Sequence, residues 1–521
     1  MKRTFITALA AMMLCTTAQA ETTNTNADNA AIEAKAEKTP KKKKEVKYNE
    51  NGDIIKTGIN LGPLPVVAFD ADRGFQFGAL MNLYDFGDGK NYPNPNSQWY
   101  FEASAYTKES AINSYKFIVN YDNKTLIPGV RMSICTGYYK DAALDFYGFN
   151  GYQSNYNMSF LEPTFVWEDS KAGEKLENKF INKGKLPKGF YRFGRDLIKA
   201  KIDFTGKITK NFYWEAGYHF QWLKAQSFAP KGYAVMANPT DTDMFIPRAD
   251  LDGQDGTTLF DLYKAWGIIP EDQANGGLTS SIRLGLMYDS RNVENNPTKG
   301  IWAEAHIIAA PKWLGTTHEN YKYCATFRHY VPMVQNKLTF AYRLGYQGTI
   351  GNKSPWYSLP FYTNMGIKAD NDGFGGYRTV RGLMLNRVQG LDVGYFNAEF
   401  RYRFVDFKLA KQNIAFALSA FCDGAHVFRG YNMAFTDEAK AALLSIDPVI
   451  NPAGNPIRGA AMAKQYKNFV YFDQKDGFHG AAGAGLRFIM NQNFIVAFEY
   501  ARCFNKQDGT GAFYINTGFL F

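Results

Sequence analysis

The stretch NFYWEAGYHFQWL, residues 211–223, indicates the fold because its residues alternate strictly in character. One face carries apolar side chains, namely Phe212, Trp214, Ala216, Tyr218, Phe220 and Trp222. The opposite face carries mostly polar or small ones, namely Tyr213, Glu215, Gly217, His219 and Gln221. Successive side chains of a β-strand point to opposite sides, so this period of two predicts a strand with one apolar and one polar face.

The same alternation recurs in LIKAKIDFT (197–205), SIRLGLMYD (281–289) and KLTFAYRLGYQ (337–347). A soluble sandwich of two sheets would also alternate. However, the segments run for about 9 to 13 residues, the length that a tilted strand needs to cross a bilayer. Aromatic residues flank the apolar faces, as they do at the two interfaces of outer-membrane barrels. Every backbone polar group in lipid needs a partner, so a spanning sheet must close on itself.

We therefore predict an all-β fold, a transmembrane antiparallel β-barrel of sixteen strands, an even number as in bacterial barrels. The expected strands are 64–70, 74–84, 97–107, 113–121, 129–139, 190–206, 211–224, 280–289, 299–310, 319–331, 336–349, 393–404, 413–427, 479–490, 493–504 and 512–521. All four long connections fall on one side, which we expect to be external; they are 140–189, 225–279, 350–392 and 428–478. The first strand is short and contains Pro65, which favours a sheet edge.

The N-terminus predicts export from the cytoplasm. Residues 1–20, MKRTFITALAAMMLCTTAQA, have the basic start, apolar run and small-residue exit of a secretory signal peptide. Residues 21–62 are polar and include four consecutive lysines, Lys41–Lys44, so we expect a disordered periplasmic tether before a barrel at 63–521. This arm either contacts acidic lipid headgroups or a partner protein, or is a solvated leader.

The four cysteines beyond the signal peptide, Cys135, Cys324, Cys422 and Cys503, lie in predicted strands of which no two are neighbours. Paired cysteines need Cα atoms within about 7 Å, so we expect free thiols. No CxxC spacing occurs, and we expect no metal site. A helical membrane protein is also excluded, because the chain contains no apolar run of about 20 residues.

The C-terminal stretch AFYINTGFLF places Phe513, Ile515, Thr517, Phe519 and Phe521 on one face. A last strand that ends in an aromatic residue resembles the recognition signal of bacterial outer-membrane barrels. Together with the signal peptide, it predicts the outer membrane of a Gram-negative bacterium. The tether and the C-terminus are expected on the periplasmic side.

Several stretches in the second half together resemble one family. YDSRNVENNPTKG (288–300) is similar to a periplasmic turn with the pattern Asp-x-Arg…Pro-x-x-Gly, carried here by Asp289, Arg291, Pro297 and Gly300. TVRGL (379–383) is similar to a Val-Arg-Gly-aromatic loop tip, with Leu383 at the aromatic position. NAEFRYRF, FCDGAHVF and GAGLRF follow in the expected order, at 397–404, 421–428 and 483–488. Over about residues 280–521 the chain therefore resembles the BamA/TamA-type barrels, also called bacterial surface antigens.

Alternation also predicts a polar site inside the barrel. Glu399 and Asp423 fall on the inward faces of two strands joined by a short turn, within a rung or two of each other. Two inward carboxylates favour a cation. The resemblance implies that the loop GFGGYRTVRGLMLNRVQG (373–390) folds into the lumen, where Arg381 meets both carboxylates and Gly382 permits a tight tip. The alternative is an exposed glycine-rich loop with incidental arginines.

The resemblance also limits the expected function. Family members that assemble other barrels carry periplasmic POTRA domains, whereas only the lysine-rich tether precedes the first strand here, so we expect a member that lacks them. We expect insertion or translocation of a protein or lipid client, with outer-membrane lipid and a separate periplasmic protein as partners. The alternative is a passive pore or a structural surface barrel without insertase activity.

Enzymatic and cofactor-binding functions are not expected. The chain has six histidines and no GxSxG motif, and His306 beside Glu304 is more typical of a hydrogen bond in the lumen than of a catalytic base. DLDGQDGTTLFD (250–261), within the acidic external loop 241–261, departs from a calcium-binding loop at Asp255 and Asp261. We expect no cofactor, no metal and no nucleic-acid partner.

Overall fold

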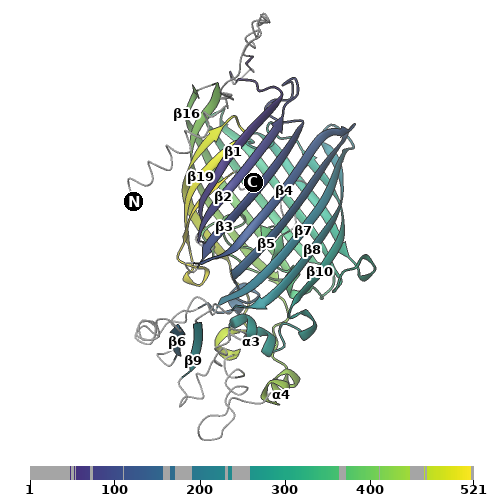
Figure 1. Cartoon of the computed structure of the whole chain (residues 1–521), viewed down its shortest axis with the longest axis vertical. Helices are drawn as coiled ribbons and strands as arrows, with labels where there is room; N and C mark the ends of the chain where they lie inside the picture. The colour runs from purple at the N-terminus through teal and green to yellow at the C-terminus, as the bar shows by residue number, and fades with distance from the viewer. Residues whose placement is uncertain are drawn as a thin grey trace, which may run out of the picture.

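The computed structural model describes residues 47–48, 52, 54–70, 74–108, 111–156, 165–169, 191–228, 233–237, 258–362, 371–409, 411–445, 463, 466–517 and 521. Sixteen antiparallel strands form a barrel, as predicted (Figure 1). In sheet order they are β1 (Ile59–Asp70), β2 (Gly74–Asp85), β3 (Ser97–Lys108), β4 (Ala111–Ile127), β5 (Val130–Asp145), β7 (Arg192–Lys207), β8 (Phe212–Ser227), β10 (Gly276–Asp289), β11 (Gly300–Ala310), β12 (Asn320–Val334), β13 (Leu338–Thr349), β16 (Asp392–Leu409), β17 (Gln412–Arg429), β18 (His479–Met490), β19 (Phe494–Cys503) and β20 (Ala512–Thr517).

The remaining elements lie in the connections. Two small pairs of strands are β6 (Phe165–Asp169) with β9 (Tyr233–Ala237), and β14 (Phe361–Tyr362) with β15 (Asn371–Asp372). The helices are α3 (Leu259–Ala265) and α4 (Asp437–Ser445), with short 3₁₀ turns at Gly151–Gln153, Glu271–Gln273, Lys312–Leu314, Trp356–Ser358 and Lys506–Asp508. Among the described residues, no helix has both the length and the apolar character needed to cross a membrane.

The prediction of the first strand was wrong in its length. β1 begins at Ile59, spans twelve residues and contains Pro63 as well as Pro65, so residues 59–62 belong to the sheet and not to the tether. The segment before β1 also contacts the barrel: the Ile54 amide donates to Asn413 Oδ1 at 2.9 Å. Residues 1–46, which include the predicted signal peptide and Lys41–Lys44, lie outside the described part of the chain.

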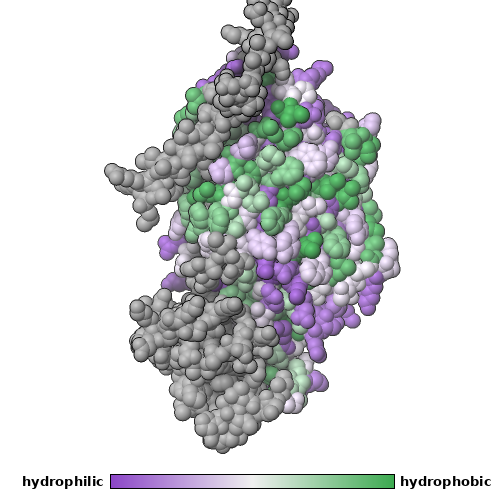
Figure 2. Space-filling model, viewed as in Figure 1, coloured by the Kyte–Doolittle hydropathy of each residue, from purple (hydrophilic) through white to green (hydrophobic). Residues whose placement is uncertain are grey.

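The barrel wall separates an apolar outer face from a polar lumen. On β10 and β11, Leu284 and Ile307 are 60% and 57% exposed, whereas the alternate residues Arg283 and Glu304 are buried. Figure 2 shows apolar side chains over much of the visible wall, with hydrophilic ones gathered toward the end that carries α3 and α4. The four cysteines are free thiols on strands that are not neighbours, as predicted.

The long connections cluster at one end of the barrel, which we call the loop end; the opposite, turn end carries short turns (Figure 1). At the loop end a buried apolar cluster, the aromatic cap, contains Phe146, Phe260, Tyr263, Trp266 and Trp356 among its members. Edge-to-face ring contacts join its parts, such as Phe146 to Tyr263 with centroids 5.2 Å apart. Alternation in the strands did not predict this second core, because loop residues have no period.

Candidate functional site

The candidate site lies on the lumen face of β16 to β19. Asn397 of β16 pairs with Asp423 of β17, and Glu399 pairs with Phe421, so the two predicted carboxylates are diagonal neighbours on one face. Glu399 and Asp423 are both fully buried. The strands therefore position both groups before any loop residue is considered.

Small residues on the next two strands leave room for the loop. Ala481 and Gly483 of β18 and Ala501 of β19 face the lumen and form a flat floor. Gly382 lies on this floor with φ +97°, and a Cβ there would come within 2.8 Å of the Ala481 Cβ. Its amide donates to the Tyr514 hydroxyl at 3.1 Å. Glycine is required at Gly382 by both its backbone conformation and this close approach.

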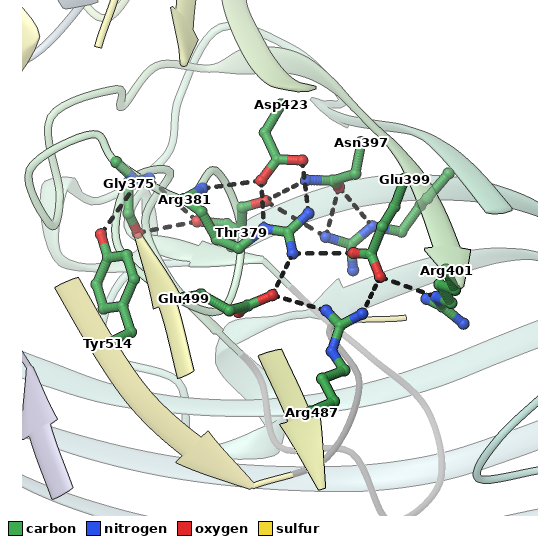
Figure 3. Close-up of polar contacts among 12 residues, drawn as sticks. Gly375, Thr379, Arg381, Asn397, Glu399, Arg401, Asp423, Arg487, Glu499 and Tyr514 are labelled. Atoms are coloured by element: carbon green, nitrogen blue, oxygen red, sulfur yellow. Dashed lines mark hydrogen bonds and ion pairs between the residues drawn. The ribbon is translucent and has the colours of Figure 1, made fainter. Parts of the chain in front are cut away.

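Arg381 enters between three acidic side chains (Figure 3). Its Nε and Nη2 atoms donate to the two oxygens of Asp423 at 2.7 and 3.0 Å, a bidentate pair. Its Nη1 atom donates to Glu399 Oε2 at 2.9 Å and to Glu499 Oε1 at 2.8 Å. The guanidinium carbon also lies 3.4 Å from the centroid of the Phe421 ring. The planar fork of arginine suits this arrangement, whereas a lysine ammonium would satisfy fewer acceptors.

Two further arginines complete the cluster. Arg487 Nη2 donates to Glu499 at 2.6 Å, and Arg487 Nη1 contacts Glu399. Arg401 Nε donates to Glu399 Oε1, the same oxygen that Arg487 contacts, at 2.9 Å. Three guanidinium groups thus face three carboxylates, and their formal charges cancel. This neutrality matters because an uncompensated charge in a buried site is costly.

We call Arg381, Arg401, Arg487, Glu399, Asp423 and Glu499 the lumen lock. The structure brings together the four residues selected from the sequence, Arg381, Gly382, Glu399 and Asp423, and adds Glu499 and Arg487, which sequence reasoning missed. Alternation alone places Glu499 inward between Phe498 and Tyr500. However, only the strand register places it opposite the loop tip.

The rest of the loop tip is apolar and buried. Val380 and Leu383 are fully buried in a cluster with Val388 and Phe374. Leu383 is therefore fully buried at the position where the resemblance to a Val-Arg-Gly-aromatic tip predicts an aromatic residue. The same loop reaches two 3₁₀ turns at the loop end through Arg387, which donates to the carbonyl oxygens of Gly151 at 2.7 Å, Ser154 at 3.1 Å and Gln507 at 2.9 Å.

A buried histidine joins the connections at the loop end. His479 contacts Asp476 Oδ1 through Nε2 at 2.9 Å and Asp508 Oδ1 through Nδ1 at 2.7 Å. The Tyr152 ring stacks on the imidazole, and its hydroxyl donates to Asp508 at 2.6 Å. Burial raises the pKa of Asp476, but hydrogen bonds from His479 and from two backbone amides outweigh it, so that the pKa lies below its ordinary value.

The predicted periplasmic turn forms a compact motif at the turn end. Arg291 makes a bidentate pair with Asp289, with distances of 2.9 and 2.6 Å, and lies 3.9 Å from the Trp302 ring centroid. Gly300 has φ +109°, and a Cβ there would lie 2.3 Å from the Ser290 carbonyl oxygen. Pro297 lies in the turn between Asp289 and Gly300, away from the lumen lock.

Glu294 of the same turn ties two neighbouring strands to it. Its carboxylate binds Lys124 at 2.8 Å and Arg131 at 3.4 Å, and its side chain is 28% exposed. Burial raises the Glu294 pKa, but these cations and Arg291 outweigh burial, so the pKa lies well below its ordinary value.

The predicted C-terminal signal is only partly on the outer face. Phe513 and Ile515 alternate with the buried Ala512 and Tyr514 and are partly exposed. Phe519 lies outside the described residues. Phe521, by contrast, is 3% exposed and packs with Trp302, Tyr330 and Ala341 inside the lumen, so it does not share one face with Phe513 and Ile515 as the alternation predicted.

The remaining candidates have structural partners. His219 contacts Asp203 at 2.7 Å in the lumen, and His306 is buried there. Of the acidic loop 241–261, residues 241–257 lie outside the described chain, while Asp261 and Thr258 form a capping box at the start of α3. Among the described residues, no group of three or more acidic, histidine or cysteine side chains is arranged to hold a metal ion.

Comparison with known proteins identifies a family domain over most of the chain. The Omp85 superfamily domain matches residues 139–521. Among solved structures, BamA from Haemophilus ducreyi lacking POTRA domains 1–3 is similar with a TM-score of 0.46 and 13% identity, covering 89% of this chain and 70% of that one. CdiB from Escherichia coli is similar with a TM-score of 0.43 and 10% identity, covering 89% and 63%. No curated protein sequence matches the chain.

Proposed function

Because this chain belongs to the Omp85 superfamily, we propose that it inserts or translocates a protein or lipid client at the bacterial outer membrane. Its partners are the surrounding lipid, the client and a separate periplasmic protein. Short turns of such barrels face the periplasm, so the turn end, with the segment before β1, lies on that side. The family match agrees with the expectation that the protein is not an enzyme.

The observation that carries this proposal is the junction between the first and last strands. β1 pairs with β2 along all twelve of its residues. With β20, in contrast, one pair joins the described residues, Asp70 opposite Tyr514. Opening the wall between two strands is costly in lipid, because each backbone group that was paired loses its partner. The junction of β1 and β20, which we call the seam, has the fewest such pairs to lose among the described residues. It is therefore the part of the wall that opens most easily.

The sequence of β1 supports a weak seam. Pro63 and Pro65 lack the amide hydrogen that a sheet ladder needs, so they are tolerated only where that position faces an edge. β2 pairs with β1 through both proline positions, so we propose that the missing donors lie on the side of the seam. A route that opens sideways lets a client pass from the barrel into lipid.

The lumen lock favours this lateral route over a passive pore. The tip of the loop 373–390 fills the lumen beside β16 to β19, and the aromatic cap covers the loop end. We propose that Arg381, held by Glu399, Asp423 and Glu499, keeps this loop in place while the seam opens. A porin would need an open water-filled path, which a buried loop obstructs.

A reversible crosslink across the seam tests the proposal. Phe69 and Ile515 are the neighbours of the Asp70–Tyr514 pair in the same register, so Phe69→Cys with Ile515→Cys can form a disulfide. The variant is the only copy of the protein in the cells. Apart from this pair it contains no cysteine in its mature chain, because alanine replaces the four native ones. The readout is the outer-membrane protein and lipid profile, with and without a reductant.

We expect the locked seam to reproduce the profile of cells in which the gene is deleted, and the reductant to restore it. The matched control is Ala305→Cys with Ala325→Cys, an outward-facing pair across the complete β11–β12 ladder. This control should have no effect. A normal profile with a fully crosslinked seam would contradict lateral opening and favour the passive barrel.

A further inference from the structure

Phe521 occupies a shaped site on the lumen wall. Its ring stacks with Tyr330, with centroids 6.5 Å apart. Two guanidinium groups flank the ring, those of Arg343 at 5.2 Å and Arg401 at 5.1 Å from its centroid. Arg401 Nη2 also donates to the main-chain oxygen of Phe521 at 3.0 Å. The residue is thus bound through both its aromatic ring and its backbone.

The site has room for a ring because of one small residue. In register, Ala341 of β13 lies between Tyr330 of β12 and Glu399 of β16. All of these side chains face the lumen, and alanine fills none of the space between its neighbours. Trp302 closes one side of the gap. We call Trp302, Tyr330, Ala341, Arg343 and Arg401 the lumen socket.

The chemistry of the lumen socket selects one class of ligand. Arginine groups over an aromatic face gain from cation–π attraction, which is stronger where water is excluded. The guanidinium of Arg401 carries donors only, so it recognises an oxygen beside the ring. An aliphatic side chain would lose the first interaction, and a ligand without a main-chain oxygen would lose the second.

Phe521 cannot occupy the lumen socket and extend the seam at the same time. Continuing the register of Asp70 and Tyr514 by seven residues would place Phe521 opposite Pro63. The described part of β20 instead ends at Thr517, and Phe521 lies against β12, β13 and β16. Because Pro63 offers no amide donor, β1 competes poorly for this residue.

We propose that the lumen socket is a binding site for an aromatic residue of an extended peptide, and that Phe521 is an internal ligand which such a peptide displaces. The inference rests on the proposed function in one respect, that the competing peptide belongs to a client protein. Displacement frees Phe521, and so couples client binding in the lumen to the state of the seam.

The test follows the Phe521 ring in the intact protein. 4-Fluorophenylalanine is introduced at position 521, and its ¹⁹F resonance is recorded in detergent with a soluble gadolinium chelate. The peptide AFYINTGFLF, the chain's own residues 512–521, serves as the competing ligand. The matched control peptide, AFYINTGFLA, lacks the final ring.

We expect a resonance protected from the chelate, which AFYINTGFLF shifts to an exposed position and AFYINTGFLA does not. A tethered ligand has an effective concentration of about millimolar, so the free peptide must reach that range. A Phe521→Ala variant should bind fluorinated AFYINTGFLF at least tenfold more tightly than the wild type. Ala341→Phe, which fills the lumen socket, should abolish this binding.

Three results would overturn the inference: a resonance broadened by the chelate without peptide, equal displacement by both peptides, or no displacement at several millimolar. The first and last use the wild-type fold, so they hold even if Phe521→Ala fails to assemble. Peptide displacement with a seam crosslink that has no effect would reject the proposed function alone. A functional seam without displacement would reject the lumen socket alone.

Discussion

Replacement of Arg381 by alanine should destabilise the barrel in a way that can be traced to one carboxylate. In the folded protein Asp423 receives three hydrogen bonds from Arg381, two from the guanidinium and one from the amide at 3.1 Å. Glu399 keeps Arg401 and Arg487 after the replacement, and Glu499 keeps Arg487. Asp423 therefore becomes the buried charge that loses its cation.

Removing one partner of a buried ion pair costs about 3–5 kcal/mol, because the other charge remains without compensation. We expect Arg381→Ala to lower the free energy of unfolding by this amount. Arg381→Lys keeps the charge but cannot bridge three carboxylates, so its cost should be smaller, about 1–3 kcal/mol. Arg381→Ala should therefore be less stable than Arg381→Lys, because only the planar guanidinium of arginine reaches all three carboxylates.

The double variant Arg381→Ala with Asp423→Ala provides the control. It removes the stranded carboxylate, so we expect it to be at least as stable as Arg381→Ala alone, with a coupling energy of about 2–3 kcal/mol. Unfolding in guanidinium, followed by tryptophan fluorescence in detergent, gives all the values needed for the cycle. Heat-modifiability on a gel and proteolysis of the loop end provide independent readouts.

A change below about 0.5 kcal/mol for Arg381→Ala, the range of ordinary surface substitutions, would refute this reasoning. Strict additivity in the double variant would also contradict it, because the two side chains would then not interact. In either case the lumen lock would be a set of contacts without a stabilising role.

Three other variants probe separate parts of the structure. Gly382→Ala should lower the free energy of unfolding by more than about 1 kcal/mol, because Gly382 has a positive φ and lies close to the methyl groups of Ala481 and Ala501. Adding Ala501→Gly should restore part of this free energy in the same unfolding assay. No restoration would contradict the contact. The pKa of Glu294 is lowered in the folded protein, so its stabilising contribution is present above the unfolded pKa of about 4.3 and is lost as the pH falls below it. The unfolding midpoint of the wild type should therefore fall more than that of Glu294→Gln between pH 6 and pH 3. Parallel curves for the two proteins would contradict this. His479→Ala removes the group that joins Asp476 to Asp508, while Arg387 remains 3.5 Å from Asp508, so the free energy of unfolding should fall by about 1–3 kcal/mol. Proteolysis should then cut the loop end first, whereas unchanged resistance would argue against a joining role.

Much of the barrel could be predicted because lipid imposes a strict rule on strands. Leu284, Leu286 and Ile307 face outward and Arg283 faces inward, as their alternation predicts. The same rule placed Glu399 and Asp423 inward. It failed at the start of β1 because Pro63 and Pro65 follow Ile59 and Leu61 and hide the alternation there.

Features that depend on non-local contacts could not be predicted from a periodic pattern. Glu499 joins the lumen lock through register across β18 and β19, which no local signal specifies. Phe521 fits the outward face by alternation, yet the space beside Ala341 and the two arginines bind it in the lumen. A large aromatic residue that packs beside a small residue of another strand can be predicted only after the strand register is known.

Single-channel conductance of the intact protein and of a variant lacking residues 373–390 tests most directly whether the loop obstructs the barrel. If the lumen lock holds the loop inside, the intact protein should show no steady large conductance, and the deletion should open one. Arg381→Ala should give intermittent openings between these extremes. A steady large pore in the intact protein, unchanged by the deletion, would contradict a loop held in the lumen and support a passive pore.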